Sequence, residues 1–401
     1  MRPGLRVALL SWDMPPAPTG LGRAAHEIAR ALQAAGVSVT VFSADRAHRS
    51  VDDGLEIVGV APPENGFLAR TRLKPCRGHL AMPTAFARAV AAAGGTGAFD
   101  LVEATNWYAP GALVQREGLP LVVRCSTPAV DALDPEGDER HRRDMAFAHA
   151  LERRTVMRAD AVIYNTEPHR AAMRETYALP PGHEGEVIGL SLDAALVKRG
   201  RRAGYPESAK RPRLVFIGRA ERRKGFDAML QGFAALHRDG GAPPVLAIVG
   251  LSPGDLQRRA EALGIASEVL AHVEDHGRAD DERVAALMEA THAVVAPSRY
   301  ESYGLVYREA AAWGRPCVMC AEDPSARAFV RETGAGVLAT ACEGGAVARA
   351  VREALARAEE LRAKGLAHVR SLGRDVLARR TLAVYERVAR AGEGPTAGGA
   401  R

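Results

Sequence analysis

The sequence predicts an α/β protein with two doubly wound, Rossmann-like parallel-sheet domains, and two observations support this prediction. Short apolar runs alternate with helical patterns along the chain, which is typical of parallel strands joined by crossover helices. The 401 residues are also enough for two domains, each with a sizeable core.

The N-terminal domain is expected over residues 1–192 and the C-terminal domain over 213–373. The strands predicted in the N-terminal domain are 5–11, 37–43, 100–104, 119–124, 160–164 and 185–189. Those predicted in the C-terminal domain are 213–218, 245–250, 268–271, 292–296, 316–319 and 335–338. Residues 193–212 are rich in Arg, Gly and Pro and predict a linker. A helix is expected at 374–391, and the Gly-rich residues 392–401 predict a disordered tail.

Composition excludes several classes of protein. With 47% hydrophobic and 25% charged residues the chain is globular. No apolar run approaches the length of a membrane span, and the N-terminus lacks the apolar region of a signal peptide, so a cytoplasmic protein is expected. Five cysteines argue against a disulfide framework, and Cys317 and Cys320 lie on a predicted strand as buried thiols.

The net charge of +6 does not by itself indicate a nucleic-acid partner. The arginines are scattered over many helices, and only 5% of residues are aromatic, so no stacking platform is evident. The basic balance instead suits an anionic small substrate, or peripheral contact with an anionic membrane surface.

Two glutamates lie eight residues apart around a predicted helix start. A short strand at 292–296 is followed by a loop that carries Glu301, and a helix resumes at Leu305 with Glu309 in its second turn. Amides near Gly304 and Leu305 would be unpaired at the helix N-terminus, which suits phosphate oxygens. One glutamate could accept hydrogen bonds from a sugar and the other from a ribose diol; two solvated surface charges are the alternative.

A second candidate loop follows the first strand of the C-terminal domain. Arg219 and Lys224 lie between Gly218 and Gly225, where two cations would neutralise a diphosphate. The chain contains no Asp-x-Asp motif for a divalent ion, so no metal is expected. Ordinary surface charge is the alternative for each cation.

A glycine loop near the N-terminus fits the form GxGxxA through Gly20, Gly22 and Ala25, with Asp45 after the next strand. In a dinucleotide fingerprint the first glycine directly follows the strand, whereas here residues 12–19 intervene. A loop that contacts a ligand is therefore favoured over NAD binding, and a purely structural loop is the other alternative.

Together these segments resemble the retaining GT-B glycosyltransferases of family 4 over nearly the whole chain. The most specific element is the pair Glu301 and Glu309 within PSRYESYGLVYREAAAWGRP. The resemblance implies two Rossmann-like domains that face a central cleft, with acceptor contacts in the first domain and the donor in the second. It also implies that the helix at 374–391 crosses back to the N-terminal domain.

The resemblance also implies roles for individual residues. Glu301, Arg219 and Lys224 would form the catalytic group, with Glu301 on the transferred sugar and the two cations on the donor diphosphate. The donor site would further include Gly22, Ser302, Tyr303, Gly304, Leu305 and, on the ribose, Glu309. Residues expected on the acceptor or sugar side are Asp13, Gly20, Trp107 and Ser126.

The expected function is therefore a retaining, metal-independent transfer of a sugar from a nucleotide-diphosphate donor, a UDP- or GDP-sugar, to a hydroxyl acceptor. A glycan, a lipid-linked glycan and a small natural product are all open as acceptors. One departure from the family pattern is Ser126, which stands where relatives carry a histidine; another is the segment 188–193. A non-catalytic nucleotide-sugar-binding or scaffold protein is the alternative, and an NAD-dependent dehydrogenase is a third.

Overall fold

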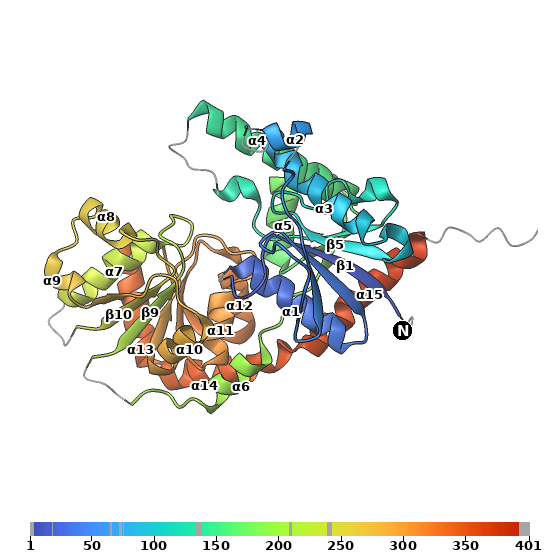
Figure 1. Cartoon of the computed structure of the whole chain (residues 1–401). Coiled ribbons are helices and arrows are strands. Elements are labelled where there is room, and N and C mark those ends of the chain that lie inside the picture. The colour runs from blue at the N-terminus through green and yellow to red at the C-terminus, as the bar shows by residue number, and fades with distance from the viewer. Residues whose placement is uncertain are drawn as a thin grey trace, which may run out of the picture. The chain divides into compact units, whose positions relative to one another are not determined.

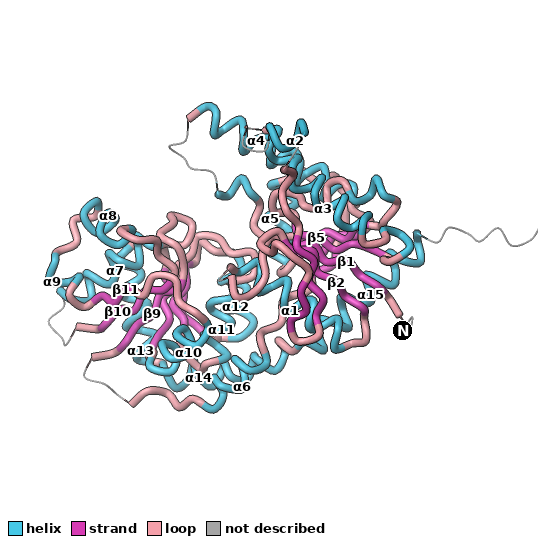
Figure 2. Tube along the Cα trace, viewed as in Figure 1, coloured by secondary structure: helices cyan, strands magenta, loops and turns pink. Residues whose placement is uncertain are grey.

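The computed structural model describes residues 4–17, 19–64, 66–71, 74, 76–132, 138–207, 211–238 and 243–392 (Figure 1). It divides into two compact units: unit 1 comprises Met1–Ser191 and Arg374–Arg401, and unit 2 comprises Leu192–Gly373. Each unit contains one twisted sheet with helices around it (Figure 2). The expected disordered tail at 392–401 lies, apart from residue 392, outside the described residues.

The sheet of unit 1 has the order β3-β4-β2-β1-β5-β6-β7-β8 and is parallel except for the pair β3–β4. Its strands are β1 (Arg6–Ser11), β2 (Ser38–Ser43), β3 (Ser50–Asp52), β4 (Leu55–Gly59), β5 (Leu101–Thr105), β6 (Leu121–Arg124), β7 (Ala161–Tyr164) and β8 (Glu186–Val187). Its α-helices are α1 (Gly20–Ala34), α2 (Gly66–Thr71), α3 (Ala81–Ala92), α4 (Glu139–Arg158), α5 (Glu167–Thr176) and α15 (Arg374–Gly392). Its short 3-10 turns in the described residues are η1 (Arg77–Leu80), η2 (Gly95–Gly97), η3 (Val114–Glu117) and η4 (Ala129–Ala132).

The sheet of unit 2 has the order β11-β10-β9-β12-β13-β14, and all its pairs are parallel. Its strands are β9 (Arg213–Ile217), β10 (Val245–Val249), β11 (Val273–Asp275), β12 (Ala293–Val295), β13 (Cys317–Cys320) and β14 (Gly336–Ala339). Its helices are α6 (Ala194–Arg202), α7 (Phe226–Arg238), α8 (Asp255–Ala262), α9 (Ser267–Leu270), α10 (Asp281–Ala290), α11 (Leu305–Ala312), α12 (Pro324–Thr333), α13 (Gly344–Ala356) and α14 (Ala358–His368), with the 3-10 turn η5 (Val369–Ser371). The two doubly wound parallel sheets confirm the predicted fold class.

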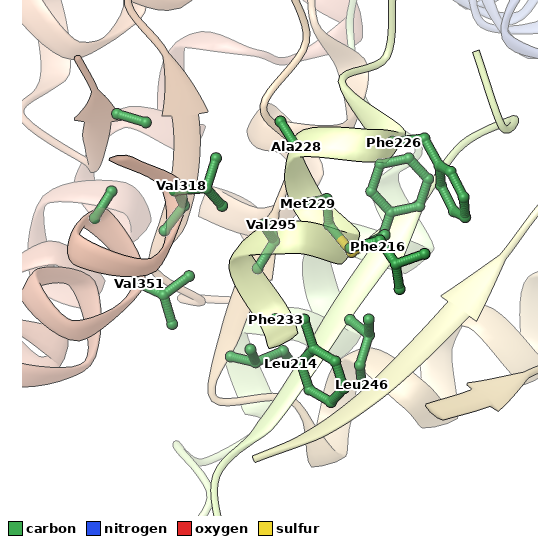
Figure 3. Close-up of a cluster of buried hydrophobic side chains, with 14 of the residues drawn as sticks. Leu214, Phe216, Phe226, Ala228, Met229, Phe233, Leu246, Val295, Val318 and Val351 are labelled. Atoms are coloured by element: carbon green, nitrogen blue, oxygen red, sulfur yellow. The ribbon is translucent and has the colours of Figure 1, made fainter. Parts of the chain in front are cut away.

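The core of unit 2 explains why its strands read as continuous apolar runs. Both faces of the parallel sheet are covered by helices, so nearly every residue of the inner strands β10, β12 and β13 is buried. One face packs against α7 and α13 around a cluster of aromatic and aliphatic side chains (Figure 3). Its labelled members are Leu214, Phe216, Phe226, Ala228, Met229, Phe233, Leu246, Val295, Val318 and Val351. Cys317 and Cys320 are buried as predicted, and none of the five cysteines is in a disulfide.

Two secondary-structure elements were predicted wrongly or missed. Residues 268–271, expected as a strand, lie mostly in α9, and the strand follows at Val273–Asp275. The apolar pair Val269 and Leu270 packs against the core from a helix, and a short apolar run does not distinguish helix from strand. The hairpin β3–β4 was not predicted, although Asp53 and Gly54 both adopt the positive φ of a tight hairpin turn.

The predicted linker at 193–212 contains a regular helix. Asp193 caps α6 by accepting a 2.8 Å hydrogen bond from the main-chain N–H of Leu196. Gly200 in this helix lies so close to α11 that an added Cβ would be 2.6 Å from the carbonyl oxygen of Ala312. The first part of this segment is therefore packed into unit 2, and residues 208–210 lie outside the described residues.

Helix α15 packs on α1 within unit 1, although the two helices are distant in sequence. Arg374 donates a 2.8 Å hydrogen bond to Glu27 of α1. Further along α15, Tyr385 donates a 2.6 Å hydrogen bond to the buried Glu103, which also accepts from Arg124 at 2.8 Å. The contact of Tyr385 is buried and fixes α15 against the sheet of unit 1, and the partly buried contact of Arg374 holds it to α1.

Candidate functional site

Three loops of unit 2 meet at the carboxyl edge of its parallel sheet, where ligands bind in doubly wound folds. They follow β9, β12 and β13 and cover residues 218–225, 296–304 and 321–323. The first two are joined by main-chain contacts: the N–H of Arg299 donates to the carbonyl of Arg223 at 2.8 Å. At Gly225, with φ of +68°, an added Cβ would lie 2.1 Å from the carbonyl oxygen of Pro297, so only glycine allows this approach.

Glu301 is at the centre of these loops. Its carboxylate accepts hydrogen bonds from the Lys224 ammonium at 2.6 Å and the Ser298 hydroxyl at 2.7 Å, and an Arg223 nitrogen lies 3.6 Å away. Burial alone would raise the pKa of Glu301, but Lys224 and Arg223 outweigh it and hold the pKa below its ordinary value. Glu301 is therefore ionised at neutral pH, and the structure brings two of the predicted catalytic residues into direct contact.

Arg219, the third predicted catalytic residue, extends from the same loop toward solvent. Its side chain is 67% exposed and forms a 2.7 Å ion pair with Glu221. An exposed ion pair is weak, so this guanidinium can change partner at little cost. The structure thus places Arg219 on the same edge of the sheet but does not bring it to Glu301.

The start of α11 follows Glu301 directly. Gly304 precedes the helix with φ of +76°, and among the described residues no side chain caps the first amides, which begin at Leu305. Such amides carry partial positive charge and suit an anion. The glycine is obligatory here because an added Cβ would lie 1.7 Å from the Tyr307 ring.

The remaining predicted donor residues differ in exposure. Ser302 is partly exposed in the loop, whereas the Tyr303 side chain is buried against the Arg308 guanidinium, 3.8 Å from the ring centre. Glu309 lies on α11 and is only 6% exposed. The side chain of Tyr303 therefore packs in the interior of unit 2. A contact of this residue with the donor would have to come from its main chain.

In unit 1, Asp13 and Thr19 organise the predicted glycine loop. The Thr19 hydroxyl donates to Asp13 at 2.6 Å and accepts from the N–H of Gly22 at 3.0 Å, which caps α1. Burial raises the pKa of Asp13, and the Thr19 hydrogen bond opposes this shift. A Cβ at residue 22 would lie 2.3 Å from the Asp13 carboxylate, so packing within unit 1 is enough to require a glycine there. Gly20 is the first residue of α1 and is exposed.

Trp107 and Ser126 follow β5 and β6, at the carboxyl edge of the sheet of unit 1. The carbonyl of Trp107 accepts a 2.6 Å hydrogen bond from the indole of Trp12. The main-chain N–H of Ser126 donates to Asn106 at 2.6 Å, and its hydroxyl lies 3.0 Å from that of Thr105. Ser126, which follows β6, is thus held by two neighbours at the end of β5.

A histidine does lie beside Ser126, although not in the sequence position expected for it. His169 of α5 is fully buried, with Nε2 3.3 Å from the carbonyl oxygen of Ser126, and its Nδ1 accepts from the N–H of Asn165. Burial lowers the pKa of His169 to about 4, so the ring is neutral. Because His169 is buried and contacts the main chain of Ser126, it is placed to support the loop that carries Ser126.

Sequence reasoning missed Ser298, Arg223, Asp323 and His169. Arg223 was hidden in the basic run Arg222–Lys224, and Ser298 in the loop after β12. Asp323 carried a signal, since Asp followed by Pro is a typical helix start. Its carboxylate accepts from the main-chain N–H of Glu301 at 3.2 Å, a contact that local patterns do not predict.

No group of three or more His, Cys, Asp or Glu side chains in the described part of the chain is placed to hold a metal ion. No helix in the described ranges is both long and apolar enough to cross a membrane.

Comparisons with known proteins match both units. The family model described as "Glycosyl transferases group 1" matches residues 198–365, and that described as "Glycosyl transferase 4-like domain" matches residues 19–190. The D-inositol 3-phosphate glycosyltransferase 1 of Catenulispora acidiphila is 30% identical over 409 residues, covering 94% of this chain and 92% of the relative.

Solved structures have the same fold. The sucrose-phosphate synthase of Thermosynechococcus elongatus superposes with a TM-score of 0.75 at 21% identity, covering 96% of this chain and all of that one. Anabaena HepE, solved in complex with UDP and glucose, gives a TM-score of 0.63 at 19% identity, covering 97% of this chain and all of that one. These likenesses identify the fold of the two units as GT-B.

Proposed function

The chain belongs to the group 1 glycosyltransferases, and we propose that it transfers a sugar from a nucleoside diphosphate donor to a hydroxyl group, with retention of anomeric configuration and without a metal ion. The observation that carries this proposal is the cluster of Lys224, Ser298 and Glu301 beside the start of α11. It combines a cation and helix amides for phosphate with a carboxylate for sugar hydroxyls.

In this proposal the donor diphosphate lies between Arg219, Lys224 and the amides at Leu305. The positive charge of these groups stabilises the leaving diphosphate, which is electrostatic catalysis. On donor binding Lys224 shares its charge between Glu301 and phosphate, and Arg219 exchanges its exposed pair with Glu221 for the diphosphate. Glu309 binds the ribose hydroxyls.

The transferred sugar lies against Glu301, whose lowered pKa keeps it an acceptor of hydrogen bonds from sugar hydroxyls. In the retaining step the bond from the anomeric carbon to the diphosphate breaks, and the acceptor oxygen bonds to the same face of that carbon. The acceptor proton passes to the leaving phosphate oxygen. No separate general base is needed in this scheme.

The donor is proposed to be a UDP- or GDP-sugar. UDP-glucose is the first probe because HepE was solved with UDP and glucose. For the acceptor, Trp107 and Ser126 are proposed to lie on the acceptor or sugar side of unit 1, together with Asp13 and Gly20. The name of the Catenulispora relative makes a phosphorylated cyclitol one probe, beside glycan and lipid-linked hydroxyl acceptors.

A thermal-shift screen with UDP-, GDP-, ADP- and dTDP-sugars in EDTA tests the donor site. A bound donor stabilises the folded state by about 3 kcal/mol at a hundredfold excess over Kd. We expect one nucleotide to raise the Tm of the wild type, and Arg219→Ala to reduce that rise. Arg222→Ala is the matched control, because Arg222 is an exposed cation of the same loop.

If Arg222→Ala weakens donor binding as much as Arg219→Ala, the loop acts only through its overall charge and the assignment of Arg219 is wrong. Binding that disappears in EDTA would contradict metal independence. Retention is tested separately by NMR: the product and donor must share the anomeric configuration, and an inverted product would exclude the proposed step.

A further inference from the structure

Asp323 joins β13 to α12 at the carboxyl edge of the sheet of unit 2. One carboxylate oxygen accepts a 3.0 Å hydrogen bond from the main-chain N–H of Ser325, so the residue caps α12. The side chain is only 1% exposed. Helix caps are usually at the surface, and a buried one calls for a second role.

The second role is visible in the same oxygen. It also accepts a 3.2 Å hydrogen bond from the main-chain N–H of Glu301, 22 positions away in the sequence. Lys224 and Ser298 hold the carboxylate end of Glu301, whereas Asp323 holds its backbone. The position of the Glu301 carboxylate is thus fixed from both ends.

We propose that Asp323 is a positioning residue for glycosyl transfer, which sets the place of the Glu301 carboxylate by holding its main-chain N–H. The inference rests on the proposed donor site, in which Glu301 contacts the transferred sugar. A small shift of a group that binds the reacting sugar lowers the rate strongly, because the reacting geometry must be held closely.

The surroundings of Asp323 indicate which substitutions keep this function. Its second oxygen is buried without a hydrogen-bond partner among the described residues. Burial and the negative charge of Glu301 raise the pKa of Asp323 to about 7, so the site tolerates a neutral side chain. Asparagine keeps the accepting oxygen for both N–H groups, whereas serine is long enough to cap α12 but too short to hold Glu301 as well.

The experiment compares Asp323→Ser, Asp323→Asn and Asp280→Ser. Asp280 is the matched control, since it caps α10 through a 2.8 Å hydrogen bond from Arg283 and is exposed. Steady-state kinetics with a nucleotide-sugar donor are measured for each variant, normalised to folded protein. We expect Asp323→Ser to lower kcat/KM for the donor by about tenfold or more, Asp323→Asn to stay within about threefold, and Asp280→Ser to match the wild type.

An Asp323→Ser variant that is as active as Asp280→Ser would overturn the inference. If Asp323→Ser does not fold, the hydrogen exchange rate of the Glu301 amide in the wild type tests the inference instead. Slow exchange supports the hydrogen bond from this amide to Asp323, and unprotected exchange refutes it. Glu301→Gln separates this inference from the donor site. Full activity in Glu301→Gln contradicts the donor site itself, whereas loss there with an active Asp323→Ser contradicts only the role of Asp323.

Discussion

The contact between Lys224 and Glu301 links the two loops that the sequence singled out separately. Each residue was predicted from its own pattern, one from a basic loop and one from two spaced glutamates. Their 2.6 Å contact means that neither acts alone: the lysine keeps the partly buried glutamate ionised, and the glutamate holds the lysine at the edge of the sheet. Substitution of one residue therefore changes the other.

This coupling predicts a change in pH dependence. In Lys224→Ala the burial of Glu301 is no longer offset by that cation, so the pKa of Glu301 rises. The acidic limb of kcat/KM should move to higher pH in Lys224→Ala and stay in place in Arg222→Ala. A limb that does not move in Lys224→Ala would mean that ionised Glu301 is not required.

His169 predicts a pH-dependent stability. Burial lowers its pKa from 6.5 to about 4, so the folded state disfavours the protonated ring. The unfolded state then binds more protons, and stability is present above pH 6.5 and falls as the pH drops toward 4. The shift corresponds to roughly 3 kcal/mol.

We expect His169→Gln to lose less stability than the wild type between pH 6.5 and 4, as measured by urea unfolding at each pH. His48→Gln is the control, because His48 is exposed. Identical pH profiles for the wild type and His169→Gln would show that another group, such as the partly buried His368, accounts for the loss of stability in acid.

At the scale of single elements, the turn before α11 depends on one glycine. Gly304 has a positive φ, and an added Cβ would also overlap the Tyr307 ring. Gly264 after α8 has φ of +62° but open space around it. Gly264→Ala should therefore cost only the backbone strain, about 1 kcal/mol, whereas Gly304→Ala should cost more and should abolish donor stabilisation in the thermal-shift assay. Equal stability losses would contradict the packing role of Tyr307.

Helix α15 supplies a second prediction at this scale. Tyr385→Phe removes a buried hydrogen bond to the charged Glu103 and should lower the free energy of unfolding by about 2 kcal/mol. Arg387, on the same helix, forms an exposed ion pair with Glu186 of β8. Arg387→Ala removes this pair and should lower the free energy of unfolding by less than about 1 kcal/mol. Chemical denaturation measures both, and a larger loss in Arg387→Ala would contradict the anchoring of α15 through its buried face.

The same elements show what the sequence could and could not predict. Parallel strands such as β9 and β10 were found because burial on both faces makes their runs almost wholly apolar. The edge strand β11 is short and polar, so the neighbouring apolar turn of α9 was taken for it. Contacts such as Asp323 to Glu301 depend on which strand ends lie together, which is a property of strand order and not of local pattern.

At the scale of the whole molecule, the order of strands explains how distant motifs become one candidate site. β9 and β12 are neighbours in the sheet of unit 2, so loops 77 residues apart in sequence place Lys224 against Glu301. The role proposed for Glu309 on a ribose rests on the family resemblance and not on the geometry. Ser126 remains the main departure from the family pattern, because a histidine is expected at its position. It is held by hydrogen bonds with Asn106 and Thr105.

The central claim, that Glu301 serves the transfer step and Lys224 serves donor binding, is tested most directly by donor kinetics. Nucleoside diphosphate release and sugar transfer are measured for the wild type, Glu301→Ala, Lys224→Ala and Arg222→Ala at saturating acceptor. We predict that Glu301→Ala abolishes transfer, that Lys224→Ala chiefly raises the KM for the donor, and that Arg222→Ala matches the wild type. Unchanged turnover in both Glu301→Ala and Lys224→Ala would contradict the site.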